Sequence, residues 1–121
     1  MTTHPHSAKS PVVAGALTLH IEGTANEVIR CVGRLTSENH SHLKELVRPL
    51  IYPGSRVILD FSELVYLDSA GLGAVVGLYV SSKTHRCQLE LVKLNPRIKE
   101  LLGLTNLLGA FESAARHGTK F

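Results

Sequence analysis

The alternation of apolar and polar residues near the start of the chain predicts a β-hairpin. Residues 17–21 (LTLHI) and 27–32 (EVIRCV) alternate in the way that buries one face of a strand. The residues between them include glycine and asparagine, which favours an antiparallel pair. Residues 1–13 are polar instead, and we expect them to form a mobile tail.

Helical spacing of apolar residues follows the hairpin. Thr36 and Ser37 are suitable helix caps, and Glu38 would then lie in the first turn. Pro49 should end this helix, because proline has no amide proton to donate. The apolar positions that define the helix are Leu43, Leu46, Val47 and Leu50.

A second amphipathic helix is expected over residues 70–83. Its predicted apolar positions are Leu72, Val75, Val76 and Tyr79. Its other side carries the small residues Gly73, Gly77 and Ser81. Glycine weakens a helix, so the two glycines on this side indicate that another backbone approaches the helix closely there. In the simplest case this backbone belongs to the sheet beneath.

The remaining segments complete the predicted fold. Residues 56–61 (RVILDF) and 87–93 (CQLELVK) have strand patterns, residues 95–103 carry the cap and stop signals of a short helix, and a last short strand is expected near residues 109–111. Helices between strands imply parallel crossovers. We therefore predict one α/β domain over residues 14–121, with a mixed sheet of about five strands, an opening antiparallel hairpin and crossover helices.

Composition narrows the class of function. The 121 residues are 44% hydrophobic and 19% charged, as in one globular domain with its own core. The formal net charge is +3 and the basic residues are scattered, so we expect no nucleic-acid partner. Asp68 is the one charged residue between positions 64 and 82, and the apolar residues beyond it fall short of the ~20 that a membrane span needs, so we expect no membrane insertion.

The two cysteines and the first residues indicate the compartment. Cys31 and Cys87 have no metal-ligand spacing and are expected to be free thiols in a reducing environment. The first residues lack the apolar core of a signal peptide. We expect a cytoplasmic protein, and the residue pattern indicates neither a metal nor a cofactor.

A polar turn within an apolar stretch is the main candidate for function. Residues 68–73 (DSAGLG) lie where a strand is expected to end and a helix to begin. The hydroxyl of Ser69 is expected to cap the first backbone amides of the helix, which Gly71 and Gly73 would leave uncluttered. This hydroxyl would be exposed, oriented and close to the positive end of the helix dipole.

The stretch VILDFSELVYLDSAGLGAVVGLY, residues 57–79, resembles the signature of the STAS domain family, and specifically that of the anti-sigma factor antagonists. In this signature an apolar strand with an aspartate precedes an Asp-Ser-(Ser/Thr/Ala)-Gly-Leu-Gly turn that opens a helix. The resemblance covers roughly residues 17–111, because the hairpin, Gly33 and residues 89–107 follow in the family's order.

The resemblance implies a partner switch with Ser69 as the phosphorylated residue. The unphosphorylated antagonist would bind an anti-sigma factor serine kinase and free the sigma factor, phosphorylation would release the antagonist, and a phosphoserine phosphatase would reset it. The chain would act as a regulator of transcription and not as an enzyme, and whether it forms a homodimer stays open. The expected contact surface comprises the turn, the exposed side of the following helix and the loop before the first helix: Asp68, Ala70, Gly71, Leu72, Gly73, Arg34, Thr36, Ser37 and Asn39. Gly71 and Gly73 would permit close approach by the partner.

The chain departs from the family before the first helix. Switching antagonists usually carry Gly-Glu-(Leu/Ile)-Asp there, whereas residues 33–36 read Gly-Arg-Leu-Thr. Arg34 is instead a candidate to pair with the phosphoserine or with an acidic partner.

Other functions remain open at this point. The main alternative is a STAS module that does not switch, as a fixed part of a signalling scaffold or a lipid-transport complex, in which Ser69 is only a helix cap. A hydrolase would use Ser69 as a nucleophile with His40 or His42 as the base, although the turn is not a Gly-X-Ser-X-Gly elbow. A nucleotide-binding module would use the glycine-rich turn, which lacks the pattern of a phosphate-binding loop.

Overall fold

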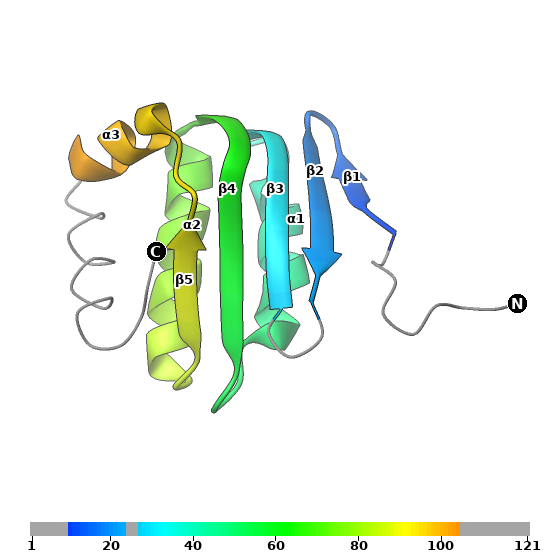
Figure 1. Ribbon diagram of the computed structural model, residues 1–121, viewed down its shortest axis with the longest axis vertical. Coiled ribbons are helices and arrows are strands. Elements are labelled where there is room, and N and C mark those ends of the chain that lie inside the picture. Colours follow the sequence, from blue (N-terminus) through cyan, green and yellow to red (C-terminus); the bar gives the residue numbers. More distant parts are fainter. Residues whose placement is uncertain (1–9, 24–26, 105–121) are drawn as a thin grey trace, which may run out of the picture.

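The computed structural model describes residues 10–23 and 27–104, which form a five-stranded mixed sheet with three helices (Figure 1). The order of the strands across the sheet is their order along the chain. The first two pairings are antiparallel and the last two are parallel. The predicted α/β fold with an opening hairpin and crossover helices is confirmed. The strands are β1 Val12–Ala14, β2 Leu17–Glu22, β3 Glu27–Leu35, β4 Arg56–Leu67 and β5 Gln88–Val92.

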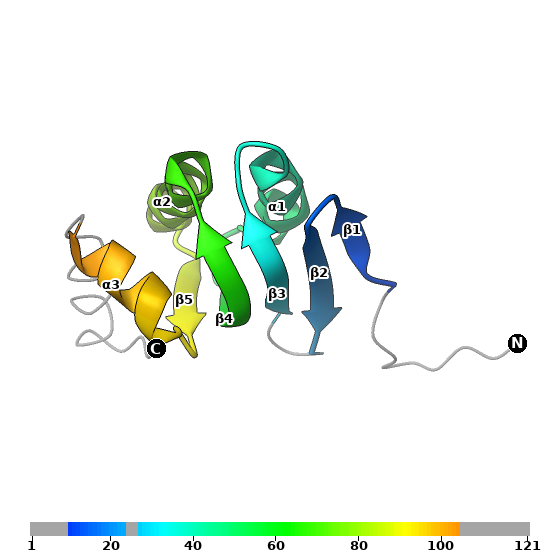
Figure 2. The ribbon, with the colours of Figure 1, turned by 90° about the horizontal axis from the view of Figure 1, so that it is seen from above.

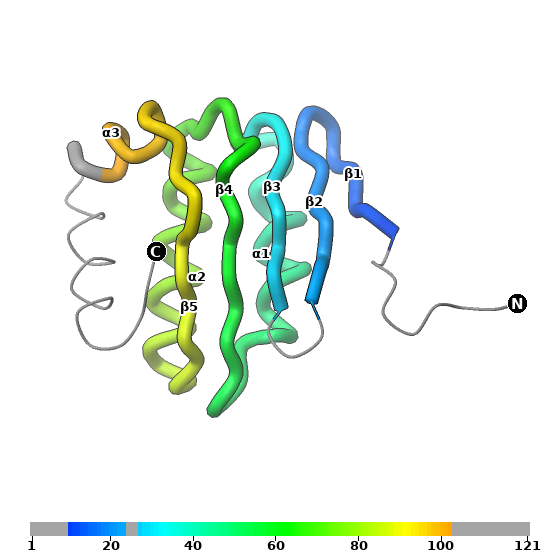
Figure 3. The backbone as a smooth tube through the Cα atoms, in the orientation of Figure 1, coloured from blue at the N-terminus to red at the C-terminus, as the bar shows by residue number. Residues whose placement is uncertain are grey.

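The helices are α1 His40–Val47, α2 Ser69–Thr84 and α3 Pro96–Leu104. Helices α1 and α2 cross over between parallel strands and cover the same face of the sheet, whereas α3 lies beyond β5 (Figures 2 and 3). A 3-10 turn, Arg48–Leu50, contains Pro49 and ends α1, as predicted. At the start of α3 the Asn95 Oδ1 atom accepts a hydrogen bond of 2.9 Å from the Ile98 amide, which confirms the predicted cap.

An aliphatic core fills the space between the sheet and the two crossover helices. Alternate residues of each central strand are buried there, and burial of each large apolar side chain stabilises the fold by about 1.5–3 kcal/mol. Cys31 and Cys87 are buried free thiols, and burial raises the pKa of the Cys31 thiol, so it packs as a small apolar group. The fully buried members of the core include Leu17, Leu19, Ile29, Leu43, Leu59, Phe61, Val75 and Leu91.

Several element boundaries differ from the prediction. The strands predicted over residues 27–32 and 56–61 extend to Leu35 and Leu67. Val12 and Val13 were assigned to the polar tail but lie in β1, where Val12 pairs with Leu19 and packs against the core. The predicted caps Thr36 and Ser37 precede α1, and the Thr36 carbonyl accepts hydrogen bonds from the amides of residues 39 and 40 in a turn. The strand expected near residues 109–111 lies outside the described residues.

Helix α2 buries a different face from the predicted one. Its buried residues are Gly71, Ala74, Val75, Leu78 and Ser82, whereas Leu72, Val76 and Tyr79 are only partly buried. An added Cβ atom at Gly73 or Gly77 would meet nothing within 4 Å, so the sheet is not what approaches these glycines. The helix is apolar on most sides, and its spacing could not reveal which side faces the core.

The second half of β4 has no β5 strand beside it. The last residue pair between the two strands is Asp60 with Val92. Beyond it α3 packs against β4, and the side-chain amide of Asn95 donates to the Leu64 carbonyl. The end of β4 therefore lies between β3 and α3, and this position shapes the candidate site.

Candidate functional site

The turn at residues 68–73 is anchored where β3 and β4 end together. Leu35 pairs with Leu67 as the last pair of these parallel strands. The Asp68 amide then donates to the Leu35 carbonyl across 3.2 Å. This contact carries the strand pairing one step farther and fixes the point at which α2 leaves the sheet.

Asp68 is the N-cap of α2, a role that the sequence had suggested for Ser69. Its Oδ1 atom accepts a hydrogen bond of 2.8 Å from the Gly71 amide, and its Oδ2 atom accepts one of 2.9 Å from the Ser37 amide. These two bonds, from Gly71 first and Ser37 second, hold the pKa of the Asp68 carboxyl below its usual value. The Asp68 carboxylate thus ties the start of α2 to the loop before α1.

Ser69 is the first residue of α2 and is exposed. The prediction that its hydroxyl caps the helix is wrong, because Asp68 already accepts from the Gly71 amide. The prediction that the hydroxyl is accessible at the helix N-terminus agrees with the structure. A group added to this hydroxyl would therefore project from the surface without removing the cap.

Gly71 and Gly73 have different surroundings. An added Cβ atom at Gly71 would lie 2.4 Å from the Leu35 carbonyl oxygen, closer than real Cβ atoms come. The close approach at Gly71 is therefore made by the protein's own β3 and not by a partner, which corrects the expectation for this residue. Gly73 is exposed and open, and it remains a candidate for contact.

The loop before α1 is held by the buried side chain of Asn39. Its Oδ1 atom accepts from the Thr36 amide at 2.9 Å, and its Nδ2 atom donates to the Arg34 carbonyl at 3.0 Å. Asn39 is only 1% exposed, so it supports the expected contact surface from beneath and offers no side chain to a partner. Ser37 is exposed beside it.

His40 gives no support to the hydrolase alternative. It begins α1 near Asp68, but its Nδ1 atom is buried and without a hydrogen-bond partner among the residues that the structure describes. A base that activates Ser69 would have to be oriented by such a partner. His42 is exposed on α1.

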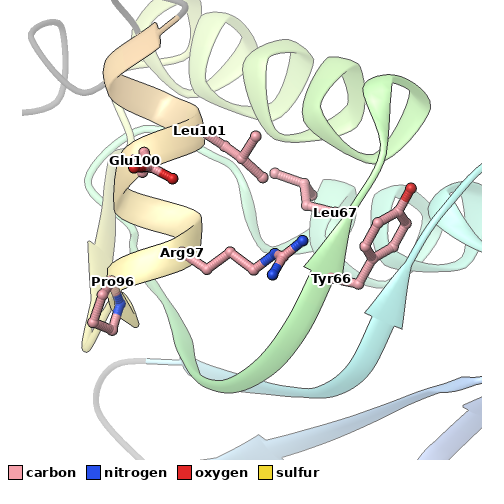
Figure 4. A pocket seen from close by; sticks show the side chains of 6 residues that line it. All are labelled: Tyr66, Leu67, Pro96, Arg97, Glu100 and Leu101. Atoms are coloured by element: carbon pink, nitrogen blue, oxygen red, sulfur yellow. The ribbon is translucent and has the colours of Figure 1, made fainter.

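A pocket of about 600 Å³ lies next to the turn, between the end of β4 and α3 (Figure 4). Tyr66 lines this pocket, and the Arg34 guanidinium stacks over the Tyr66 ring, 4.2 Å from its centroid. The residues that line the pocket are Tyr66, Leu67, Pro96, Arg97, Glu100 and Leu101. The sequence had pointed to Arg34 but not to Tyr66 or Arg97, because the packing of α3 beside β4 depends on where β5 ends.

Metal binding has no candidate site in the described part of the chain. Over residues 10–23 and 27–104, histidine, cysteine, aspartate and glutamate side chains form no group of three or more that could hold an ion. Over the same residues, no helix is long and apolar enough to cross a membrane. The chemistry available at the turn is that of an exposed hydroxyl beside a capped helix start.

Comparison with known families agrees with this architecture. The pattern of the STAS domain family matches residues 17–119, and the chain belongs to the STAS domain family. The chain is 24% identical over 101 residues to the anti-sigma-B factor antagonist of Bacillus subtilis (strain 168), a match that covers 83% of this chain and 93% of that protein.

Solved structures show the same fold. The unphosphorylated anti-sigma factor antagonist SpoIIAA is 23% identical with a TM-score of 0.64, over 77% of this chain and 84% of that one. The Bacillus cell fate determinant SpoIIAA in its phosphorylated form is 22% identical with a TM-score of 0.61, over 84% of this chain and 98% of that one. The proteins named here are regulators and not enzymes.

Proposed function

We propose that this protein is an anti-sigma factor antagonist of the bacterial cytoplasm that is switched by phosphorylation of Ser69. Unphosphorylated, it binds a serine kinase that also serves as an anti-sigma factor, and the sigma factor is freed. Phosphorylation by that kinase releases the antagonist, and a phosphoserine phosphatase restores it. The proposal is supported by the similarity to the antagonists and by the geometry of the turn.

The observation that carries the proposal is the division of roles between Asp68 and Ser69. Asp68 supplies the cap that α2 needs, and Ser69 is left exposed at the first helical position. A serine that capped the helix would lose its hydrogen bond when modified, whereas this one is not needed for the cap. The fold should therefore survive modification.

A phosphate at Ser69 would change the surface and not the core. It adds about −1.5 to −2 charges at pH 7, next to the ionised Asp68 carboxylate. The positive end of the α2 dipole offsets part of this charge within the domain. A partner packed over the turn would instead have to bury the phosphate, so binding is lost while folding is retained.

The residues around the turn are proposed to form the partner surface. Ala70, Leu72 and Gly73 lie at the start of α2, and Thr36 and Ser37 lie on the loop that Asp68 ties to it. Arg34 lies near the end of β3, just before this loop. Asn39 and Gly71 hold this surface in place from within.

The experiment is a pull-down from lysate of the source cell with wild type, Ser69→Glu and Ser69→Ala as baits. We expect wild type and Ser69→Ala to retain an ATP-binding kinase and Ser69→Glu to lose it, because glutamate imitates part of the phosphate charge. The matched control is Ser10→Glu, which adds the same charge at an exposed serine before β1. Mass spectrometry of the wild-type bait should find phosphate on Ser69.

The non-switching module makes the opposite prediction. If wild type and Ser69→Glu retain the same partner and Ser69 carries no phosphate in cells, the protein is a fixed interaction part. Release of Ser69→Ala by kinase and ATP at the wild-type rate would exclude Ser69 as the acceptor. Sedimentation of the purified protein would show whether it forms a homodimer.

A further inference from the structure

Two arginines without carboxylate partners lie at Tyr66: Arg97 lines the pocket beside the turn, and Arg34 stacks on the Tyr66 ring. Arg30 and Arg56, on the sheet, pair with glutamates at 2.7 Å and 2.5 Å. Among the described residues, neither Arg34 nor Arg97 forms such an ion pair. Both are exposed at the end of the molecule where Ser69 lies.

Tyr66 brings the two arginines into one site. Arg34 covers its ring from β3 at 4.2 Å. Figure 4 shows Arg97 reaching from α3 towards Tyr66, whereas Glu100 stays close to α3. Glu100 is the carboxylate of the pocket lining. The Asp68 carboxylate keeps its charge, but its two oxygens accept from backbone amides, so both guanidinium groups stay open to an incoming carboxylate.

We propose that this pocket, together with Arg34, is a docking site for an acidic segment of the partner protein. The inference rests on the proposed function: the partner covers the turn that carries Ser69 and makes a second contact at this neighbouring pocket. Guanidinium groups bind carboxylates through paired hydrogen bonds. The apolar side chains of Leu67, Pro96 and Leu101 line the same pocket and accept the apolar stem of a glutamate or a neighbouring apolar residue.

The position of the pocket explains why an acidic segment fits this site. Tyr66 and Leu67 directly precede Asp68 and Ser69, so a partner that covers Ser69 also reaches the pocket. A segment with glutamates or aspartates gains two ion pairs there. The same acidic segment is repelled by a phosphate on Ser69, which adds electrostatic repulsion to the steric cost of covering the turn.

The first test is charge reversal at the two arginines. Arg34→Glu and Arg97→Glu should each weaken binding of the kinase retained by wild type about tenfold, and wild-type affinity should fall as salt rises. The matched control is Lys99→Glu, which makes the same charge change at an exposed position of α3 outside the pocket lining. Equal affinity of all three variants would overturn the docking site and leave the proposed function standing.

The second test needs no kinase. Backbone NMR shifts of the wild-type protein are followed during titration with a short peptide of glutamate and leucine, and with its lysine and leucine counterpart. Shifts at Arg34, Tyr66 and Arg97 with the acidic peptide alone, lost in Arg34→Glu, support the docking site even if no kinase is found. Shifts elsewhere, or equal shifts with both peptides, contradict it.

A third measurement tests whether Arg34 binds an acidic segment of the partner or the phosphate on Ser69 of its own chain. With phosphoserine incorporated at position 69, the second pKa of the phosphate is read by ³¹P NMR in wild type and Arg34→Gln. The docking site predicts the same value in both proteins. A higher value in Arg34→Gln would assign Arg34 to the phosphate and overturn the proposed role of Arg34.

Discussion

The contact between Gly71 and Leu35 gives the sharpest test of how the turn is built. Replacement of Gly71 by alanine puts a methyl group 2.4 Å from the Leu35 carbonyl oxygen and 3.0 Å from the Leu35 Cγ atom. The nearest obstacle is a backbone oxygen, so no change of rotamer relieves the clash. This oxygen also accepts the Asp68 amide, and its displacement would disturb the anchored end of β4.

The expected magnitude follows from two opposing effects. Overpacking of a core site costs about 1–3 kcal/mol, and a backbone obstacle places this site in the upper half of that range. Alanine gains up to about 1 kcal/mol over glycine in helix propensity. We expect Gly71→Ala to lower the free energy of unfolding by about 1–2 kcal/mol.

The assay is urea unfolding followed by circular dichroism, with Gly73→Ala as the matched control. Gly73 lies two positions farther along the same helix, is exposed, and has open space around an added Cβ atom. Gly73→Ala should therefore stabilise the protein, by up to about 1 kcal/mol. If both variants are more stable than wild type, the Leu35 carbonyl yields freely and the close approach is not what requires glycine at position 71.

Two further predictions concern the groups that hold the turn and its neighbouring loop. Asp68→Asn should destabilise the protein, because an amide oxygen can accept from the Gly71 amide but its nitrogen cannot accept from the Ser37 amide. The pKa of Asp68 is lowered on folding, so the stability that its carboxylate contributes is present above the unfolded pKa of about 3.9 and is lost as pH falls below it. The urea midpoints of wild type and Asp68→Asn should therefore converge as pH falls from 7 to 3. A constant difference between the two midpoints would contradict the role of the Asp68 carboxylate as the cap. Asn39→Ala should lower the free energy of unfolding by about 1–3 kcal/mol, because the Thr36 amide and the Arg34 carbonyl lose the side chain that pairs with them. Thermal unfolding measures this loss, and an unchanged melting temperature would show that water replaces the side chain.

The arrangement of strands and helices was largely readable from the sequence because each element has its own local signal. Asn95 and Pro96 mark the start of α3, and alternation marks β2 and β3. The edge strand β1 has only three residues, too few for its alternation to stand out from the polar tail. Helix α2 is apolar on most of its surface, so its buried face depends on tertiary packing.

The candidate site was readable in part. Exposure of Ser69 follows from its place between a strand and a helix, and the structure agrees with it. The exchange of roles between Ser69 and Asp68 was not readable, since both residues are good caps and the choice depends on the Ser37 amide, 31 positions away in sequence. The pocket at Tyr66 depends likewise on a long-range contact.

The order of the strands bears on when the turn that carries Ser69, the proposed acceptor, forms during synthesis. Each strand pairs with the one made just before it, so the sheet can grow at one edge as the chain leaves the ribosome, and no strand has to insert between two others. The turn takes its shape only when β3 and β4 have paired and the Leu35 carbonyl has met the Asp68 amide. A kinase that phosphorylates Ser69 as proposed would therefore recognise a completed sheet and not a linear peptide, and a nascent or misfolded chain would escape it.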